Sequence, residues 1–418
     1  MPDIEVHLDS GPQTRLVGLA RAQRIRGKET FVFEYSASWL DAPDRFALEP
    51  ALPLDRGRFV PRSGLPLFGA LADSAPDTWG RRLMQRRERR QAERERRPVR
   101  TLLESDYLLG VSDFTRAGAL RLRVPGAPDF SAPLRSGIPP LVELGRLLQV
   151  SERILRDEDT EEDLQLIFAP GSSLGGARPK ASVTDNQGNL CIAKFPKETD
   201  EYSVETWEAV ALALAHRAGI EVPEHRLIRA AGKPVLLSRR FDRNGQGRVP
   251  YLSALAMSGL ADGERGSYPE LVDLLTRHGA AARADSIQLY KRVAFNVLVS
   301  NVDDHLRNHG FLRKSGEGWT LSPAFDLNPV PVDVRPRVLT TLIDLDDGTC
   351  SRELLESTAT HFGLAPNPAR ALLKQVAEVT RTWREVAQSL GARPAEIARM
   401  ASAFEHEDLQ NILRDSRR

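Results

Sequence analysis

The segment that most constrains this chain is Asn-Val-Asp-Asp-His-Leu-Arg-Asn at 301–308, which is followed eighteen residues later by Asp326. In kinase-like phosphoryl transfer, a first Asp orients and deprotonates a hydroxyl group. An Asn five residues later and a second Asp hold Mg²⁺ against the nucleotide phosphates. Carboxylate and amide oxygens are hard ligands that suit Mg²⁺. The spacing therefore predicts magnesium-dependent phosphoryl transfer, with Asp303 as the catalytic residue and Asn308 and Asp326 as metal ligands.

The same residue types also have a simpler explanation, because Asp and Asn are common in turns and helix caps. Each of the three residues alone could serve such a turn, whereas their combined spacing favours catalysis. Within the cluster, we expect Asp303 to carry the chemistry and Asp304 to be a solvated neighbour.

Composition narrows the class of protein. A hydrophobic content of 41% in 418 residues is ordinary for a globular chain and allows more than one packing unit. The formal net charge of +1 argues neither for nor against a nucleic-acid partner. Two cysteines exclude a disulfide framework, no apolar stretch approaches roughly twenty residues, and the N-terminus does not resemble a signal peptide. We therefore expect a cytoplasmic protein with no membrane association.

The order of predicted elements indicates an α+β chain with two lobes. Strands are expected at 4–8, 30–35, 118–124, 164–168, 181–184, 190–195, 225–228 and 234–240, and in a hairpin at 310–321. Helical patterns cover 81–100, 141–157, 204–218 (ended by Gly219), 268–301 and the region from 351 onward. This order predicts a β-rich N-terminal subdomain at 1–125, a nucleotide-binding lobe at 126–240 and a mostly helical lobe at 241–418.

A loop rich in Gly and Ser, Pro170–Lys180, lies between two predicted strands. Its backbone N–H groups could approach phosphate closely, although a plain hairpin turn explains it equally well. Lys194 ends the next apolar strand, where a charge is costly unless it meets an anion such as phosphate. The alternative is an edge-strand lysine that reaches solvent. Glu208, on the helix that follows, is the expected partner of Lys194, and Glu205 is the other candidate.

The segment Ser-Arg-Arg-Phe-Asp-Arg at 238–243 closes a predicted strand at the position where a two-lobed kinase has its hinge. Backbone groups of Arg239, Arg240 and Phe241 could bind the adenine edge there. By itself, the segment is only a basic strand end.

Arginines are concentrated in Arg81–Arg100, which holds ten arginines and three glutamates. One interpretation is a surface for phosphate or for an acidic partner. A solvated helix face with i,i+4 pairs such as Arg89–Glu93 is the favoured interpretation, since no aromatic residues interleave with the arginines.

The motifs together resemble those of the HipA family, the kinase toxins of bacterial toxin–antitoxin pairs. The resemblance covers nearly the whole chain and implies a kinase-like fold. It rests on the loop ending in Gly-Ala-Arg-Pro-Lys at 176–180, Ala-Lys-Phe-Pro at 193–196, Arg-Arg-Phe-Asp-Arg at 239–243, Asn-x-Asp-x-His-x-x-Asn at 301–308, Pro-Ala-Phe-Asp-Leu at 323–327 and Asp-Ser-Ala-Pro-Asp-Thr-Trp-Gly at 73–80.

The resemblance implies a role for each matching position. Asp303 would be the catalytic base, and Asn308 and Asp326 would bind Mg²⁺. Lys194 would contact the nucleotide phosphates, and His305 would support the catalytic loop or the nucleotide. The expected ATP-binding set comprises Ser173, Leu174, Gly175, Gly176, Ala177, Lys180, Lys194, Arg239, Arg240, Phe241 and His305.

Ser173 matches the serine that such kinases autophosphorylate, and the neighbouring Ser172 is the alternative. The resemblance implies that this modification expels the loop from the ATP site and shuts the enzyme off. The added negative charges on a loop built to cradle phosphate would compete with ATP.

The function implied is an ATP- and Mg²⁺-dependent serine/threonine protein kinase that arrests growth, with an aminoacyl-tRNA synthetase as a candidate target. The expected partner is a helix-turn-helix antitoxin that brings the chain to DNA only indirectly; a dimer in that complex is left open. The alternatives are a small-molecule or lipid-type kinase, and a DNA-bound co-repressor. Two departures from the family pattern concern ligand contacts and substrate choice: 251–255 lacks its His-Gln-Glu/Asp motif, and 177–180 differs before the lysine.

Overall fold

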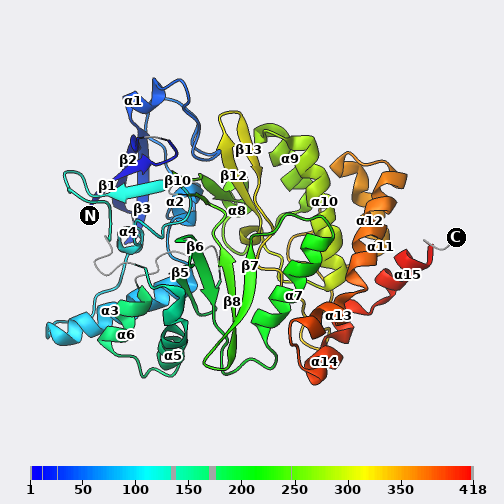
Figure 1. The fold of residues 1–418 in the computed structure, drawn as a ribbon. Helices are drawn as coiled ribbons and strands as arrows, with labels where there is room; N and C mark the ends of the chain where they lie inside the picture. The colour runs from blue at the N-terminus through cyan, green and yellow to red at the C-terminus, as the bar shows by residue number, and fades with distance from the viewer. Residues whose placement is uncertain are drawn as a thin grey trace. The chain divides into compact units, whose positions relative to one another are not determined.

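The computed structural model describes residues 2–11, 13–25, 27–132, 138–168, 176–245 and 247–415 (Figure 1). The chain divides into two compact units. The first unit comprises Met1–Glu198, Ala230–Lys233 and Leu237–Ala261, and the second comprises Thr199–Arg229, Pro234–Leu236 and Asp262–Arg418. Strands are concentrated in the N-terminal part and helices in the C-terminal part, which confirms the predicted α+β class. The division at 1–125, 126–240 and 241–418 stays a prediction.

Four antiparallel strands form the N-terminal sheet in the order β3-β2-β1-β4. They are β1 (Asp3–Leu8), β2 (Arg15–Ile25), β3 (Lys28–Tyr35) and β4 (Leu120–Arg123). Alternation places Ile4, Val6 and Phe33 in the core, because successive strand residues point to opposite faces. The strands expected at 4–8, 30–35 and 118–124 are confirmed. No separate strand was expected at β2, where the run at 16–20 has no polar residues and therefore does not alternate.

The helices of the first unit correct one prediction. They are α1 (Ala37–Leu40), α2 (Gly69–Asp73), α3 (Thr78–Arg94), α4 (Glu104–Gly110), η1 (Leu141–Glu143), α5 (Leu144–Leu155) and α6 (Glu161–Phe168). The expected strand at 164–168 is wrong, because it lies in α6. Thr160 N–H donates to Asp163 Oδ2 over 3.0 Å, and Asp163 N–H donates to Thr160 Oγ1 over 3.2 Å. This reciprocal capping, with acidic residues in the first turn, starts a helix.

The second sheet carries both candidate lysines. Its strands occur in the order β5 (Lys180–Thr184), β6 (Leu190–Lys194), β8 (Lys233–Arg239) and β7 (His225–Ala230). β5 and β6 are antiparallel, and Lys180 is directly opposite Lys194. Because residues opposite each other share a face, the two lysines lie on one side of this hairpin. Short elements follow at β9 (Arg243–Asn244), β10 (Gly247–Arg248), β11 (Tyr251–Ser253) and α8 (Ala254–Ser258).

The helix α7 (Val204–Arg217) is a core element of the second unit, since most of its residues are buried. Ser203 caps it by accepting the Thr206 N–H over 3.3 Å. Gly219 follows its last turn with φ of 76°, a conformation that glycine adopts without strain. The predicted helix and its glycine stop are therefore confirmed.

Helices make up most of the rest of the second unit. They are α9 (Tyr268–His278), α10 (Ala282–Val299), η2 (Leu306–Asn308), α11 (Arg352–Thr358), η3 (Ala359–Phe362), α12 (Pro366–Thr380), α13 (Trp383–Ser389), α14 (Pro394–Phe404) and α15 (Glu407–Asp415). The expected hairpin consists of β12 (Gly310–Ser315) and β13 (Gly318–Leu321). In the core, Trp383 stacks on Phe404 with ring centroids 4.6 Å apart.

The helical segment expected at 268–301 is two helices and not one. Gly279 leaves the helical conformation, and Ala280 N–H donates to the Trp319 carbonyl oxygen over 2.8 Å. The position of a Cβ on Gly279 would lie 2.3 Å from the Leu275 carbonyl oxygen. The break is therefore made by a residue without a side chain and by pairing with β13.

Two further sequence expectations concern cysteines and membranes. Neither Cys191 nor Cys350 forms a disulfide bond, and both are buried. Within the described ranges, no helix has the length and apolar character that a bilayer crossing requires.

We expect the stability of the second unit to depend on pH through His406. Its Nε2 lies 3.1 Å from the Leu298 carbonyl oxygen, and its Nδ1 lies 3.5 Å from Asp408. Burial and the nearby Arg337 charge lower the pKa of His406 to about 4 from 6.5, although Asp408 opposes this shift. Because the folded state resists protonation, its stability is full above pH 6.5 and declines as the pH falls toward 4. Urea unfolding at pH 7 and pH 5 should show the decline, and His406→Gln should reduce it. An equal decline in both proteins would contradict this account.

Candidate active site

The end of α10 positions the loop at 301–308. Ser300 ends the helix in the left-handed conformation, with φ of 54°. The Asn301 N–H then donates back to the Asn296 carbonyl oxygen over 2.9 Å. This sharp exit places the loop directly after a buried helix, which is a rigid support for catalytic residues.

Asp303 projects from this loop with a side chain that is 54% exposed. Its Oδ1 accepts a hydrogen bond from Arg335 Nη1 over 2.8 Å, and the Arg335 side chain is equally exposed. A carboxylate held in this way is accessible to a substrate hydroxyl, which the predicted role of Asp303 requires.

The Asp303–Arg335 pair should contribute little to folding, because exposed ion pairs are typically worth about 0–1 kcal/mol. Arg335→Ala is therefore expected to change the free energy of unfolding by less than about 1 kcal/mol. Chemical denaturation of both proteins measures this difference. A loss of stability well above that range would show that Arg335 is a structural residue.

Asn308 presents an oxygen that lacks a hydrogen-bond donor. Its Nδ2 donates to the Asp303 carbonyl oxygen over 3.2 Å, which fixes the orientation of the amide. Its Oδ1 is buried and has no hydrogen-bond partner among the described residues. Buried polar atoms in native structures nearly always have a partner. The free oxygen is therefore consistent with a metal ligand that becomes satisfied only when the cation binds.

Asp326 has a backbone conformation that is uncommon for a residue with a side chain, with φ of 58°. Such conformations persist where the surroundings enforce them and are frequent at functional sites. Asp326 Oδ1 accepts a hydrogen bond from Asn328 Nδ2 over 3.2 Å. Asn328 N–H in turn donates to Asn301 Oδ1 over 2.9 Å, so Asp326 is connected to the loop at 301–308.

The residues present fit Mg²⁺ bound together with a nucleotide. In the described part of the chain, no three His, Cys, Asp or Glu side chains form a ready-made metal cluster. Mg²⁺ usually takes one or two protein oxygens and completes its shell with substrate phosphates and water. Asn308 Oδ1 and the Asp326 carboxylate could supply those two oxygens.

Asp304 is not the solvated residue that the sequence suggested. It is 2% exposed, its Oδ2 accepts the Tyr268 hydroxyl, and its Oδ1 lies 2.7 Å from His309 Nε2. Burial and the Asp304 carboxylate raise the pKa of Tyr268 well above its ordinary value. The tyrosine therefore stays protonated and serves as a permanent donor. The prediction of a solvated Asp304 is wrong because Tyr268, which covers this carboxylate, lies on α9. That residue is distant in sequence, so the contact could not be anticipated.

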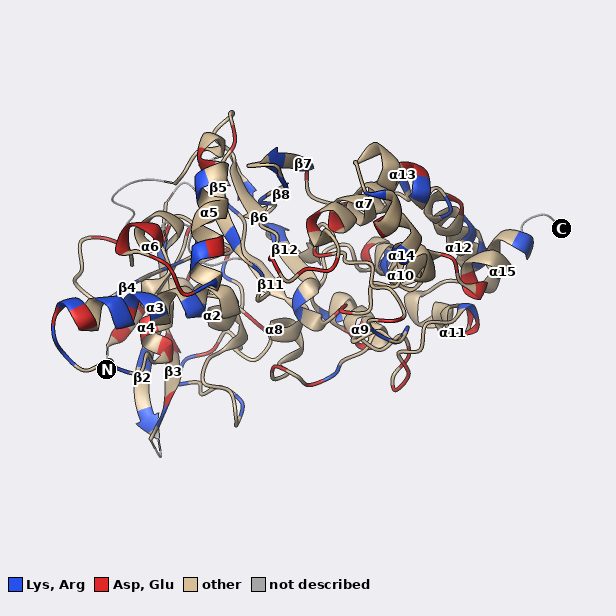
Figure 2. Ribbon diagram, turned by 90° about the horizontal axis from the view of Figure 1, so that it is seen from below, with Lys and Arg blue, Asp and Glu red and all other residues tan. Residues whose placement is uncertain are grey.

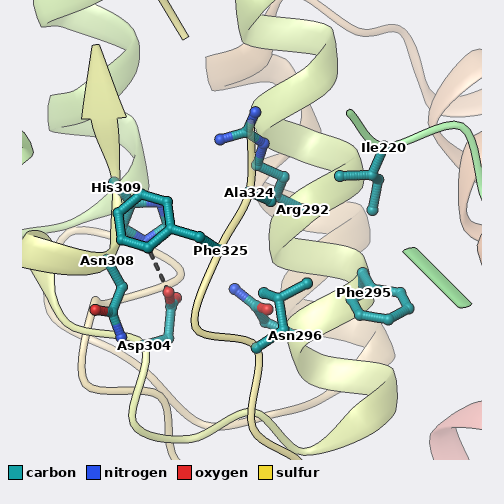
Figure 3. Close-up of a pocket in the computed structure, with 10 residues that line it drawn as sticks. Ile220, Arg292, Phe295, Asn296, Asp304, Asn308, His309, Ala324 and Phe325 are labelled. Atoms are coloured by element: carbon teal, nitrogen blue, oxygen red, sulfur yellow. Dashed lines mark ion pairs between the residues drawn. The ribbon is translucent and has the colours of Figure 1, made fainter. Parts of the chain in front are cut away.

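A pocket borders this buried cluster (Figure 3). It encloses about 310 Å³, counted with the space open to solvent, and is lined by Ile220, Arg292, Phe295, Asn296, Asp304, Asn308, His309, Ala324, Phe325 and Leu327. Burial lowers the pKa of Arg292 to about 10, although several acidic groups oppose this shift. The pocket brings Asn308 together with residues next to Asp326, so both predicted metal-binding segments meet there.

In the first unit, Lys180 is fixed by the N-terminal segment. Its Nζ forms a buried ion pair with Asp77 Oδ2 at 2.8 Å. Its carbonyl oxygen accepts the Trp79 Nε1–H over 3.1 Å. Asp77 also caps α3 by accepting the Gly80 N–H over 2.8 Å. The predicted ATP-binding Lys180 is thus attached to the start of α3, a contact between distant segments that sequence reasoning missed.

The predicted hinge residues have different surroundings. Arg240 is buried and donates to Asp242 through Nε over 2.6 Å, while its backbone N–H donates to the Leu190 carbonyl oxygen over 2.9 Å. The Phe241 ring lies 6.1 Å from the Tyr251 ring, and Arg239 is half-buried. Arg240 is therefore a structural residue in addition to any role toward the nucleotide.

The remaining predicted residues are placed as follows. Lys194 is half-buried at the end of β6, and Glu208 is buried on α7. His305 Nδ1 is buried and has no hydrogen-bond partner in the described ranges, which leaves it available to a ligand. Gly176 and Ala177 are exposed, whereas Ser172, Ser173, Leu174 and Gly175 lie outside the described residues.

Helix α3 is rich in arginine (Figure 2), and several of these arginines form ion pairs with acidic residues from other segments. Arg86 pairs with Asp157 and Asp159, and Arg94 pairs with Glu161 at 2.6 Å. Other pairs join Arg97 to Glu88 at 2.6 Å and Arg81 to Glu104 at 2.6 Å. Several arginines thus form ion pairs within the chain. Most of these pairs join residues that are further apart in sequence than the expected i,i+4 pairs.

Family models identify the class of protein to which this fold belongs. The HipA N-terminal domain matches residues 13–104, and the HipA-like C-terminal domain matches residues 172–383. The chain belongs to the HipA family. The resemblance stated from the sequence motifs is thereby confirmed.

Individual relatives agree with this assignment. A Sinorhizobium fredii protein named "Putative kinase Y4mE" is 27% identical in a 334-residue alignment that covers 71% of this chain and 71% of the relative. A Haemophilus influenzae protein named "Putative kinase" is 24% identical over 38% of this chain and 54% of its own length. Among solved structures, the HipA chain in the Shewanella oneidensis HipA, HipB and operator DNA complex has a TM-score of 0.68 and 20% identity. That alignment covers 98% of this chain and 97% of the other, so the two share a fold.

Proposed function

We propose that this chain is an ATP- and Mg²⁺-dependent serine/threonine protein kinase. The observation that carries the proposal is the loop at 301–308, where Asp303 is exposed and the Asn308 Oδ1 is buried without a donor. Asp326 is connected to the same loop through Asn328. These are the base and the two oxygens that phosphoryl transfer requires.

Each of the candidate residues would have its own role in the reaction. Asp303 would accept the proton of the attacking hydroxyl and hold that hydroxyl in line with the phosphate. Lys194 and Lys180 share one face of the β5–β6 hairpin, where they could contact nucleotide phosphates. Bound Mg²⁺ would neutralise charge on the transferred phosphate, and Asn308 and Asp326 would hold it.

We also propose that Ser173 is an autophosphorylation site that switches the enzyme off, with Ser172 as the alternative. The support is the family membership and the position of Ser173 shortly before Lys180. A phosphate on this loop would compete with the nucleotide for the same cationic groups.

The biological role proposed is that of a toxin in a toxin–antitoxin pair. The solved relative from Shewanella oneidensis is described as the HipA of such a system, bound to HipB and operator DNA. By analogy, this chain would bind a helix-turn-helix antitoxin and reach DNA through it. An aminoacyl-tRNA synthetase is the candidate substrate.

Mass spectrometry after incubation with ATP and Mg²⁺ tests the proposal. The expected result is phosphoserine at Ser173, its absence from Asp303→Ala, and phosphate on a protein substrate when the serine is replaced by Ala. Transfer to a metabolite and to no protein would instead indicate a small-molecule kinase. Absence of any transfer by the wild-type protein would contradict the proposal.

A further inference from the structure

A chain of amide groups connects Asp326 to the end of α10. Asn328 Nδ2 donates to Asp326 Oδ1 over 3.2 Å, and Asn328 N–H donates to Asn301 Oδ1 over 2.9 Å. Asn301 Nδ2 then donates to Asn296 Oδ1 over 3.1 Å. Both halves of the Asn301 amide are therefore in use, one toward the Asp326 segment and the other toward α10.

The path continues to the other side of the catalytic loop. Asn296 Nδ2 donates to the Tyr268 hydroxyl over 2.9 Å, and that hydroxyl donates to Asp304. Asp304 is the neighbour of Asp303 in the chain. Asn296 and Asp304 both line the pocket in Figure 3, where Asn296 projects from α10. One hydrogen-bond path thus spans from Asp326 to the residue beside the predicted base.

Only an amide at position 301 can make these contacts. Its oxygen must accept from a backbone N–H, and its nitrogen must donate to a side-chain oxygen. A carboxylate there could not donate, and an aliphatic residue would leave two buried groups without partners. Asn301 is 1% exposed, so water cannot replace the lost contacts readily.

We infer that Asn301 is a positioning residue that sets the Asp326 carboxylate relative to the Asn308 oxygen. The inference rests on the proposed function, in which these two oxygens hold Mg²⁺. Asn308 is fixed to the loop by its hydrogen bond to the Asp303 carbonyl oxygen. Asp326 is fixed to the same loop through Asn328 and Asn301. The separation of the two metal ligands therefore depends on the Asn301 amide, although Asn301 itself touches neither metal nor nucleotide.

The test is the binding of Mn²⁺, which takes similar oxygen ligands, in the presence of a non-hydrolysable ATP analogue. Electron paramagnetic resonance measures the concentration of free Mn²⁺ in solution. The experiment uses the full-length protein. Asn301→Ala is expected to weaken Mn²⁺ binding roughly 10- to 100-fold, as losses of outer-shell partners do. Its affinity for the analogue without metal should be unchanged, and its transfer activity should recover as the metal concentration rises.

Ser286→Ala is the matched control. Ser286 is also buried on α10, but its Oγ donates to the Ala282 carbonyl oxygen over 2.7 Å, within the helix and away from the amide path. This variant should lower the thermal midpoint and leave Mn²⁺ affinity at the wild-type value. If Asn301→Ala does not fold, Asn328→Ala removes only the donor to Asp326 and should weaken Mn²⁺ binding in the same direction.

Two outcomes would overturn the inference. The first is a folded Asn301→Ala protein with wild-type affinity for Mn²⁺ while the wild-type protein is active. The second is a wild-type protein that neither binds Mn²⁺ with the analogue nor transfers phosphate, and this result would also remove the proposed function.

Discussion

Replacement of Asp303 by Asn should lower kcat for phosphoryl transfer by roughly 10²- to 10⁴-fold, the usual contribution of a general base. The substitution keeps the size of the side chain and removes its ability to accept a proton. The wild-type carboxylate is 54% exposed and forms a weak surface pair with Arg335, so the fold should tolerate the change. Nucleotide affinity should also be retained, because the proposed metal ligands are Asn308 and Asp326.

The matched control for this experiment is Asp262→Asn. Asp262 is likewise an exposed carboxylate paired with an arginine, since its Oδ1 lies 3.2 Å from Nε of Arg307 in the loop at 301–308. Its replacement should leave kcat within a few-fold of the wild type. Equal losses in both variants would indicate a general effect of surface charge, and an active Asp303→Asn protein would exclude Asp303 as the base.

Replacement of Asp242 by Ala should destabilise the first unit by about 3–5 kcal/mol, the cost of breaking a buried ion pair on one side. Asp242 is 0% exposed, pairs with Arg240 and Arg243, and accepts the Gly118 N–H over 2.7 Å. Its loss would leave two largely buried guanidinium groups without their counter-charge. Urea unfolding at pH 7 measures the change.

The buried ion pairs of Asp242 should also affect how the stability of the first unit depends on pH. Burial alone would raise the pKa of Asp242, but Arg240 and Arg243 outweigh it and lower the pKa far below the ordinary value. A lowered pKa gives stability that is present above the unfolded-state value of about 3.9 and is lost as the pH falls below it. Asp242→Ala should remove that part of the acid sensitivity.

Asp44→Ala is the control for Asp242. Asp44 also pairs with an arginine through both carboxylate oxygens, at 2.6 and 2.7 Å, but the pair is exposed. Its loss should change stability only slightly, because solvent already screens the interaction. Similar effects at the two positions would contradict the role assigned to burial.

The features that could be predicted from the sequence are those that depend on local patterns of residues. The spacing of Asp303, Asn308 and Asp326 is visible in the chain, and so are the alternation of β1 and the stop at Gly219. Each of these follows from backbone geometry within a few residues or from a motif of fixed spacing. The α+β class and the family followed from the order of those motifs.

What the sequence could not predict depends on distant contacts. Asp304 is buried because Tyr268, 36 residues earlier, donates to it. Lys180 is paired with Asp77, 103 residues earlier, and no local signal marks that pair. The strand expected at 164–168 failed for another reason, since a short apolar run fits either a strand or a helix.

The amide path could not be predicted from the sequence either. Asn296, Asn301 and Asn328 are ordinary polar residues in the sequence, and only Asn301 belongs to a recognised motif. Their alignment follows from the sharp exit of α10 and the left-handed backbone at Asp326. Polar residues just before and just after catalytic segments are the signal that could have suggested them.

The most direct test of the account is the affinity for ATP with and without Mg²⁺, measured by calorimetry on the wild-type protein and on Asp326→Asn. If Asn308 and Asp326 hold Mg²⁺ against the nucleotide, Mg²⁺ should tighten ATP binding to the wild-type protein by at least about tenfold, or about 1.4 kcal/mol. Asp326→Asn should lose most of that gain. Equal ATP affinity of the wild-type protein with and without Mg²⁺ would contradict the account.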